Sequence, residues 1–277
     1  MLRTIFFSIF TQIAVGLVFT VLLISKEEIG KLYFRVSTGV ALILMLLGMF
    51  VRPFGPESLR QMLAVHHSAL ETMQALIYTA FGMSVFLLLA YNFVYPRAHK
   101  LLLFLTWLAG LSGVGLHAWI LASPFQEHLA GKILFVLSGF SSAFILGTVL
   151  GAMITGHWYL VKSKLTLRPL IVSSRVFIFS VLFKMLILVL TFFTFQAPEG
   201  GVNLLAWLTS LAPDSLFLLG RLFIGIVLPL IFGVMVWKTV KIRSTQSATG
   251  ILYATIILVI IGEAFAKFLS NVTGIPL

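Results

Sequence analysis

Long uninterrupted apolar runs constrain this chain more than any other feature of its sequence. Each run has about 20 to 30 mostly apolar residues, and a helix needs about 20 to cross roughly 30 Å of hydrocarbon. The runs are continuous and lack the alternation of an outer-membrane barrel, so strands are not expected. We therefore predict an all-α integral membrane protein.

About eight such runs divide the 277 residues, and we treat residues 1–277 as a single transmembrane helical domain. Charged residues, prolines and glycines lie between the runs and mark turns. Within the seventh run, Pro229 leaves the carbonyl of Gly225 without its helical donor, which predicts a kink. The predicted spans are 4–25, 33–51, 69–95, 100–122, 131–161, 170–196, 215–238 and 247–270.

The composition supports the membrane assignment and excludes other classes of protein. Only 10% of the residues are charged, whereas a soluble domain has roughly 25%. The net charge of +11 does not indicate nucleic-acid binding, because the basic residues lie between apolar runs and are not clustered in one domain. The chain has no cysteine, which excludes disulfides, cysteine-held iron–sulfur clusters and covalent c-type haem.

The distribution of cations predicts the orientation in the membrane. If eight spans are correct, the odd-numbered loops share one side and hold 12 Lys and Arg residues, and the other side holds 6. Since cytoplasmic loops are enriched in cations, both termini are expected to face outward from the cytoplasm. Arg3, with Glu27 and Glu28 after the first span, locally favours the reverse. We predict a multi-pass protein of the cell inner membrane.

A polar stripe opens the third span. His67, Glu71, Gln74 and Tyr78 are spaced so that all of them lie on one face of a helix. Such a face is costly in lipid, so it is expected to meet a partner helix or a wet cavity. One interpretation is a seam of interhelical hydrogen bonds. The other is a site for a polar-headed hydrophobic molecule, or a proton path to one.

Polar residues of other spans lie at a similar depth. Glu263 and Lys267 have the spacing of a helical ion pair, and a self-neutralising pair is the structural alternative. Arg221 follows Asp214 on one face, and its alternative is to extend to the surface. His117 lies near the outer end of the fourth span. The residues predicted to share the outer level are His67, Glu71, His117, Arg221, Glu263 and Lys267.

The inner side offers a second set. His157 stands beside Trp158 and Tyr159 at the end of the fifth span, where an interfacial aromatic belt is expected, and it is either part of that belt or a contact for a cofactor. Lys184 lies too deep in the sixth span to reach the surface, so it is expected to pair or to face a cavity.

Haem b is an open alternative, because histidines occur on separate spans at both levels. His67 (or His66) and His117 are the outer candidates for a pair of iron ligands, and His99 and His157 are the inner ones. We predict no other metal site, and haem is not the favoured interpretation.

Two motifs near the C-terminal end resemble a known family. Arg221-x-x-x-Gly225-x-x-x-Pro229 is similar to the penultimate helix of the membrane anchor subunits of polysulfide and dimethyl sulfoxide reductases. Gly262-Glu263, followed by Lys267 and Gly274, resembles their last helix. The resemblance covers roughly the final quarter of the chain and the topology. It implies a quinone-binding anchor, without a redox centre of its own, that docks an iron–sulfur subunit.

We therefore expect a quinone- or quinol-interacting membrane subunit of a respiratory electron-transfer complex, with an iron–sulfur or cytochrome partner on the outer side. Glu71 or Glu263 would exchange the quinol proton, and His67 or His117 would bond the quinone oxygen. Arg221 would polarise the ring or hold a glutamate ionised. The alternatives are a small-solute secondary transporter, which predicts broken helices, and a non-catalytic membrane scaffold or assembly protein.

Overall fold

The computed structural model describes residues 1–51, 69–93, 99–124, 128–162, 165–195 and 213–277, and of residues 69–75, 78, 92–93, 99 and 213–214 it describes the backbone alone. The chain is predominantly helical in these ranges and holds no strand there. Its elements are α1 (Leu2–Leu23), α2 (Lys26–Ile29), α3 (Lys31–Val51), α5 (Ala69–Phe93), α6 (His99–Ala122), α7 (Leu129–Val161), α8 (Arg168–Phe195), α10 (Pro213–Leu222), the π-helix η1 (Phe223–Val227), α11 (Leu228–Lys241) and α12 (Thr245–Thr273).

Seven helices in the described part of the chain are long and apolar enough to cross a membrane. They match seven of the predicted spans to within a few residues. The remaining span coincides with α5, of which the apolar stretch Thr79–Tyr91 is described with its side chains. The protein is thus a multi-pass helical membrane protein. The count of eight spans and the outward orientation of the termini remain predictions.

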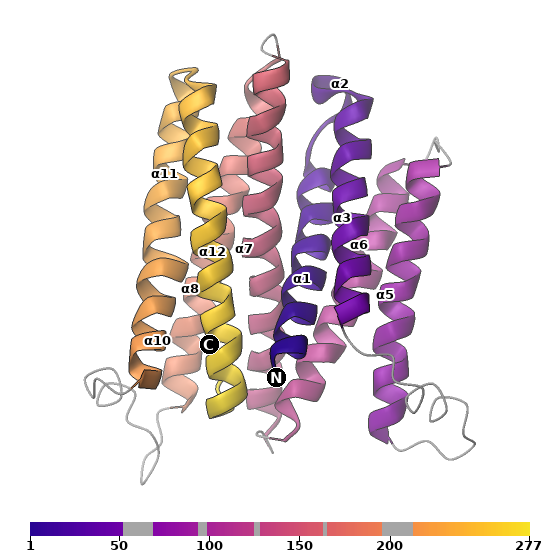
Figure 1. Ribbon diagram of the computed structural model, residues 1–277, viewed down its shortest axis with the longest axis vertical. Coiled ribbons are helices and arrows are strands. Elements are labelled where there is room, and N and C mark those ends of the chain that lie inside the picture. The colour runs from indigo at the N-terminus through magenta and orange to yellow at the C-terminus, as the bar shows by residue number, and fades with distance from the viewer. Residues whose placement is uncertain (52–68, 94–98, 125–127, 163–164, 196–212) are drawn as a thin grey trace.

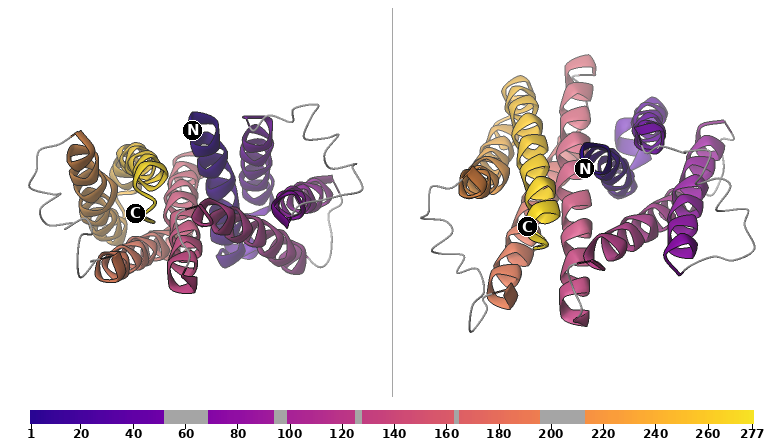
Figure 2. Two further views of the ribbon diagram at one scale, coloured as in Figure 1. Left: turned by 90° about the horizontal axis from the view of Figure 1, so that it is seen from below. Right: turned by 60° about the horizontal axis from the view of Figure 1, so that its bottom comes forward.

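Two helices form the centre of the bundle, as Figures 1 and 2 show: α1 and the 33-residue α7, which pack along each other. One flank consists of α3, α5 and α6, and the other of α8, α12 and the α10–η1–α11 segment. Both ends of the chain lie toward the same end of the bundle in Figure 1. We call this the terminal end.

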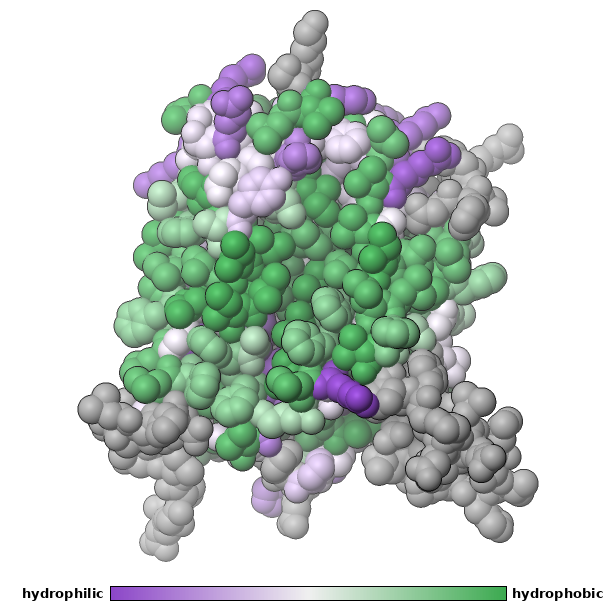
Figure 3. Space-filling view, viewed as in Figure 1, coloured by the Kyte–Doolittle hydropathy of each residue, from purple (hydrophilic) through white to green (hydrophobic). Residues whose placement is uncertain are grey.

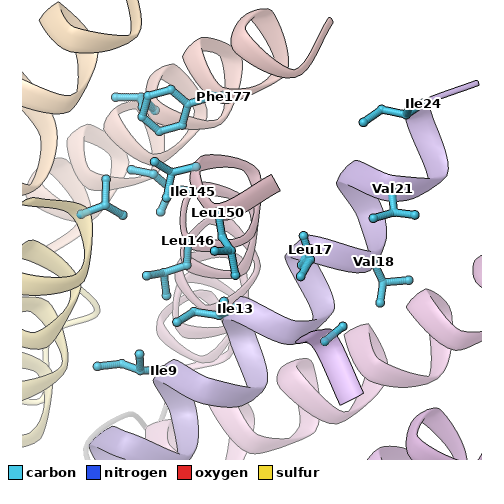
Figure 4. Close-up of a cluster of buried hydrophobic side chains, with 14 of the residues drawn as sticks. Ile9, Ile13, Leu17, Val18, Val21, Ile24, Ile145, Leu146, Leu150 and Phe177 are labelled. Atoms are coloured by element: carbon cyan, nitrogen blue, oxygen red, sulfur yellow. The ribbon is translucent and has the colours of Figure 1, made fainter. Parts of the chain in front are cut away.

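The interior between the central helices is apolar. Ile9, Ile13 and Leu17 on α1 meet Leu146 and other buried aliphatic residues of α7, and Phe177 of α8 completes this cluster (Figure 4). In lipid, however, burial of apolar groups does not drive association, so close helix approach matters more. At the crossing of α1 and α7, a Cβ atom on Gly147 would lie 2.0 Å from the backbone carbon of Gly16. The two glycines let these backbones touch.

The surface has the pattern of a protein in a bilayer. A broad hydrophobic belt covers the face seen in Figure 3, and hydrophilic residues gather above it at the end opposite the termini. Large side chains such as Phe50 and Phe193 are 86% and 72% exposed. Lipid satisfies such surfaces, whereas water does not.

The seventh predicted span is continuous but irregular. Between α10 and α11 the five residues of η1 adopt π-helical geometry, and the amide of Leu228 donates to the carbonyl of Phe223, five residues back. Pro229 follows at the start of α11 and has no amide proton to offer Gly225. The break that Pro229 predicts is therefore present as a π-helical turn, a feature that is frequent at functional sites.

The last residues turn back into the bundle. Gly274 ends α12 in the left-handed conformation with φ of 68°, which favours glycine. Ile275 and Leu277 are then buried. The amide of Leu277 donates to Ser270 Oγ at 3.2 Å, and Thr191 Oγ1 donates to the carbonyl of Pro276 at 3.3 Å.

Candidate functional site in the bundle interior

An ion pair joins the seventh and last predicted spans. The Nη2 atom of Arg221 on α10 donates to Oε1 of Glu263 on α12 at 2.8 Å, and both side chains are 0% exposed. Arg221 does not extend to the surface. Gly225 creates its space, because a Cβ atom there would lie 2.7 Å from Nη1 of Arg221. The pair thus depends on a small residue one turn further along the chain.

Lys184 brings a third charge from α8. Its Nζ atom lies 4.0 Å from Oε1 of Glu263, and its side chain is 1% exposed. The same Nζ donates to Ser142 Oγ at 3.0 Å, to Ser138 Oγ at 3.0 Å and to the carbonyl of Ser138 at 3.3 Å. The expectation that Lys184 pairs within the bundle is met by one carboxylate and two serines of α7.

Lys267 extends this array along α12. It lies one turn beyond Glu263, is partly buried, and donates from Nζ to Ser142 Oγ at 3.3 Å. Ser142 is therefore shared by Lys184 and Lys267. We refer to Lys184, Arg221, Glu263 and Lys267 together as the buried charge cluster.

A small cavity adjoins the cluster between α1, α6, α7 and α12. It has a volume of about 40 Å³, room for a few water molecules. Its polar lining comprises Ser8, Gln12, His117, Ser138, Lys267, Ser270 and Asn271. Apolar lining is provided by Ile5, Leu121 and Phe135, among others. We call this space the α1–α12 cavity. Lys267 belongs to both the cavity lining and the cluster, and Ser138 of the lining accepts a hydrogen bond from Lys184.

His117 enters the cavity from α6 and is 6% exposed. Its Nε2 atom lies 3.0 Å from Ser8 Oγ, and its ring meets the ring of Phe7 edge-on at 5.0 Å. Gln12, one turn after Ser8, is buried, and its Oε1 atom has no hydrogen-bond partner in the described part of the structure. Two neighbouring helices, α1 and α6, thus contribute polar groups to the cavity.

The cluster has more positive than negative groups. Three cationic side chains surround one carboxylate, and Nε and Nη1 of Arg221 make no hydrogen bond to the residues that the structure describes. A buried charge without a partner is costly because the interior screens poorly. This arrangement can therefore hold an anionic or proton-bearing group, and it can pass protons along the shared serine hydroxyls.

Not all predicted site residues lie near the cluster. Arg221, Glu263 and Lys267 belong to the cluster, and His117 lines the cavity beside it. Glu71 lies on α5, which packs against α3 and α6 on the other flank of the bundle (Figures 1 and 2), and its side chain is outside the described residues. His67 is likewise outside the described residues. The expected gathering at one depth is thus seen for part of the set.

His157 lies far from the cluster. It is exposed toward the other end of α7, and its Nδ1 atom lies 2.9 Å from the hydroxyl of Tyr253. Fifteen residues of α7 separate it from Ser142, about 22 Å at the helical rise. This position agrees with the interfacial interpretation of His157.

Haem ligation by His117 does not fit this arrangement. A haem iron binds an imidazole nitrogen directly, at about 2 Å. At Nε2 of His117 the iron would have to displace Ser8 Oγ, which stands 3.0 Å away. We therefore derive no step through haem.

Several site residues escaped the sequence analysis. Ser8 and Gln12 on α1, and Ser138 and Ser142 on α7, each have the i, i+4 spacing that marks one helical face. A search for polar pairs of this spacing in the first and fifth spans would have found them. Hydroxyl residues are common in membrane helices, however, so the spacing alone does not identify a site.

The fold and this interior define a class: multi-pass helical membrane proteins with a buried charge cluster beside a polar cavity. In comparisons with protein-family models, curated proteins and solved structures, no match to the chain was found. The resemblance to anchor subunits therefore remains a prediction.

Proposed function

We propose that the protein binds the head group of a quinone or quinol beside the buried charge cluster and acts as the quinone-interacting membrane subunit of an electron-transfer complex. The observation that supports this proposal is the α1–α12 cavity, whose lining combines the polar His117 and Lys267 with the apolar Leu121 and Phe135. A quinone requires this mixture, because its ring and tail are apolar and its two oxygens accept hydrogen bonds.

Each polar residue has a role in the proposal. His117 and Lys267 donate hydrogen bonds to a quinone oxygen, and a histidine can also accept the proton that a quinol releases. Ser142 links Lys267 to Lys184, and Lys184 approaches Glu263. Protons therefore have a path from the head group into the cluster. Arg221 keeps Glu263 oriented toward that path.

Electrons take a separate route. Oxidation of a quinol releases two electrons and two protons, and the electrons require an acceptor. The chain has no cysteine, so in this proposal an iron–sulfur or cytochrome partner accepts them at the terminal end, the end predicted to face outward. The protons leave through the cluster. In the reverse direction, the partner supplies the two electrons, protons enter through the cluster, and a quinone is reduced to a quinol.

The size of the cavity sets a condition on binding. At about 40 Å³ it admits water but not a whole quinone ring. Binding therefore requires lining groups to move. The chain segment around Pro276 lines the cavity and follows the end of α12, and we propose that its displacement, or rotation of Leu121, makes room.

A titration of a short-tailed quinone analogue against the reconstituted protein tests this proposal. We expect His117→Gln and Lys267→Met to weaken binding roughly fivefold each, since each disrupts one hydrogen bond worth about 1 kcal/mol. Lys100→Met is the matched control, because Lys100 is exposed at the far end of α6. Equal affinities in the wild-type protein and all three variants would show that the quinone analogue does not bind at this site.

Transport of a small solute is the second candidate, and one observation favours it. The π-helical turn η1 and Pro229 make a membrane helix irregular shortly after Arg221, and irregular membrane helices occur at the substrate sites of many transporters. Solute flux into liposomes without quinone binding would favour this candidate. If neither activity is found, a scaffold whose polar residues join helices is the remaining interpretation.

A further inference from the structure

The charge of the bundle interior is unbalanced. Lys184 and Arg221 are fully buried and share one carboxylate, that of Glu263, among the described residues. Lys267 is partly buried and donates to a serine, Ser142. If all four groups are ionised, the buried charge cluster carries two positive charges in excess. Excess charge in the interior of a membrane protein is costly, so a compensating group is expected.

The α1–α12 cavity is built to receive such a group. Lys267 reaches it from one side and His117 from the other, and no Asp or Glu is among the described residues that line it. Ser138 and Asn271, which also line the cavity, add further hydrogen-bond donors. A space with donors and a cation but without a carboxylate attracts an anion and repels a cation.

Gln12 provides an independent observation. Its side chain is 4% exposed and lines the cavity, and the amide oxygen Oε1 has no hydrogen-bond partner in the described residues. An amide group can be turned by half a rotation, which exchanges its oxygen and its NH₂ group. The turned amide presents two N–H donors to a ligand. Gln12 can thus form a hydrogen bond for which the described residues offer no partner.

The size of the cavity limits the anion. A volume of about 40 Å³ has room for a few water molecules, so a halide with one or two waters fits, whereas a phosphate ester or a lipid head group does not. We propose that the α1–α12 cavity is a binding site for one small monovalent inorganic anion of the chloride class. The ion contacts Lys267 and Gln12 and offsets part of the positive charge of the cluster.

This inference does not depend on the quinone proposal, because it rests on the charge balance and the cavity. The two proposals also make different predictions for an unliganded protein. A detergent solution without quinone contains the anion but not the quinone, so binding of the anion can be measured separately from binding of the quinone.

Binding of radioactive chloride to the purified protein in potassium gluconate tests the inference. Gluconate keeps the ionic strength constant and is too large for the cavity. We expect saturable binding of one chloride per chain, retained in Lys100→Met and weakened at least tenfold in Lys267→Met. Bromide should displace the label, and gluconate should not.

A second variant keeps the test decisive if Lys267→Met does not fold. Gln12→Leu removes the amide and preserves an apolar volume near that of the original, and it too should weaken chloride binding several-fold. Absence of saturable binding in the wild-type protein would overturn the inference. Binding that is equal in the wild-type protein and in either folded variant would overturn it as well, since the ion would then lie elsewhere.

Discussion

Gly225 and Gly262 face each other where η1 crosses α12, so closely that a Cβ atom on Gly262 would lie 2.1 Å from Cα of Gly225. Real Cβ atoms do not approach backbone to this distance. The contact brings Arg221 and Glu263 within hydrogen-bond reach, because each lies within one turn of its glycine. Helix approach through small residues and formation of the ion pair are therefore a single structural feature.

We predict that Gly262→Ala destabilises the protein. The added methyl group forces the two backbones apart, which costs about 1–3 kcal/mol as overpacking, and it also stretches the Arg221–Glu263 contact. Gly250→Ala on the same helix is the control, because nothing lies within 4 Å of a Cβ atom there. That control should be neutral or slightly stabilising through helix propensity. Thermal unfolding in detergent measures both. Equal midpoints of thermal unfolding for Gly262→Ala and Gly250→Ala would contradict the close contact of η1 and α12.

Glu263→Gln should be more damaging than Arg221→Met. Loss of Arg221 leaves Glu263 with Lys184 at 4.0 Å, whereas loss of Glu263 leaves cations without a carboxylate. Removing one member of a buried pair costs about 3–5 kcal/mol, and we expect Glu263→Gln to reach that range. The surface pair of Arg168 and Glu28 is the comparison, since Arg168 is 77% exposed. Glu28→Gln should cost at most about 1 kcal/mol.

Removing a cation should rescue the loss of the carboxylate. We predict that Lys184→Met combined with Glu263→Gln is more stable than Glu263→Gln alone, because the double variant has one uncompensated charge fewer. Methionine is unbranched like lysine and fills a similar space. The unfolding free energies of the wild-type protein, the two single variants and the double variant form a double-mutant cycle. Additive effects would mean that Lys184 and Glu263 do not interact.

Substitution of His157 should leave quinone binding unchanged. His157→Gln removes an exposed contact with Tyr253 at the end of α7 away from the cluster, so we expect less than about 1 kcal/mol of destabilisation. The quinone titration on this variant supplies the measurement. A large loss of affinity there, with His117→Gln unaffected, would move the site to the inner side.

The sequence was sufficient for the helices and for the depth of the charged residues. Continuous apolar runs predict each membrane helix, and the missing amide of Pro229 predicts a break in the seventh span. Depth along a helix follows from residue number. Arg221, Glu263 and Lys267, which were predicted to share one level, are accordingly close together.

The lateral position of a helix in the bundle does not follow from residue number. The sequence was therefore insufficient to predict which helices are neighbours. Glu71 and Glu263 were expected to share a pocket, but α5 and α12 lie on opposite flanks of α1 and α7. Which helices adjoin depends on close contacts such as that of Gly16 and Gly147, and a single sequence does not say which glycines meet. The same limit applies to Ser8 and Gln12, whose partners come from distant spans.

Photolabelling with an azido-quinone, followed by mapping of the labelled peptides, tests the central claim most directly. Our account predicts label on α6 near His117 and on α12 near Lys267, competed by unmodified quinone and reduced in Lys267→Met. The aromatic groove lined by Phe19, Phe144 and Phe179 offers the alternative location. Competed label confined to that groove, and absent from α6 and α12, would contradict the account.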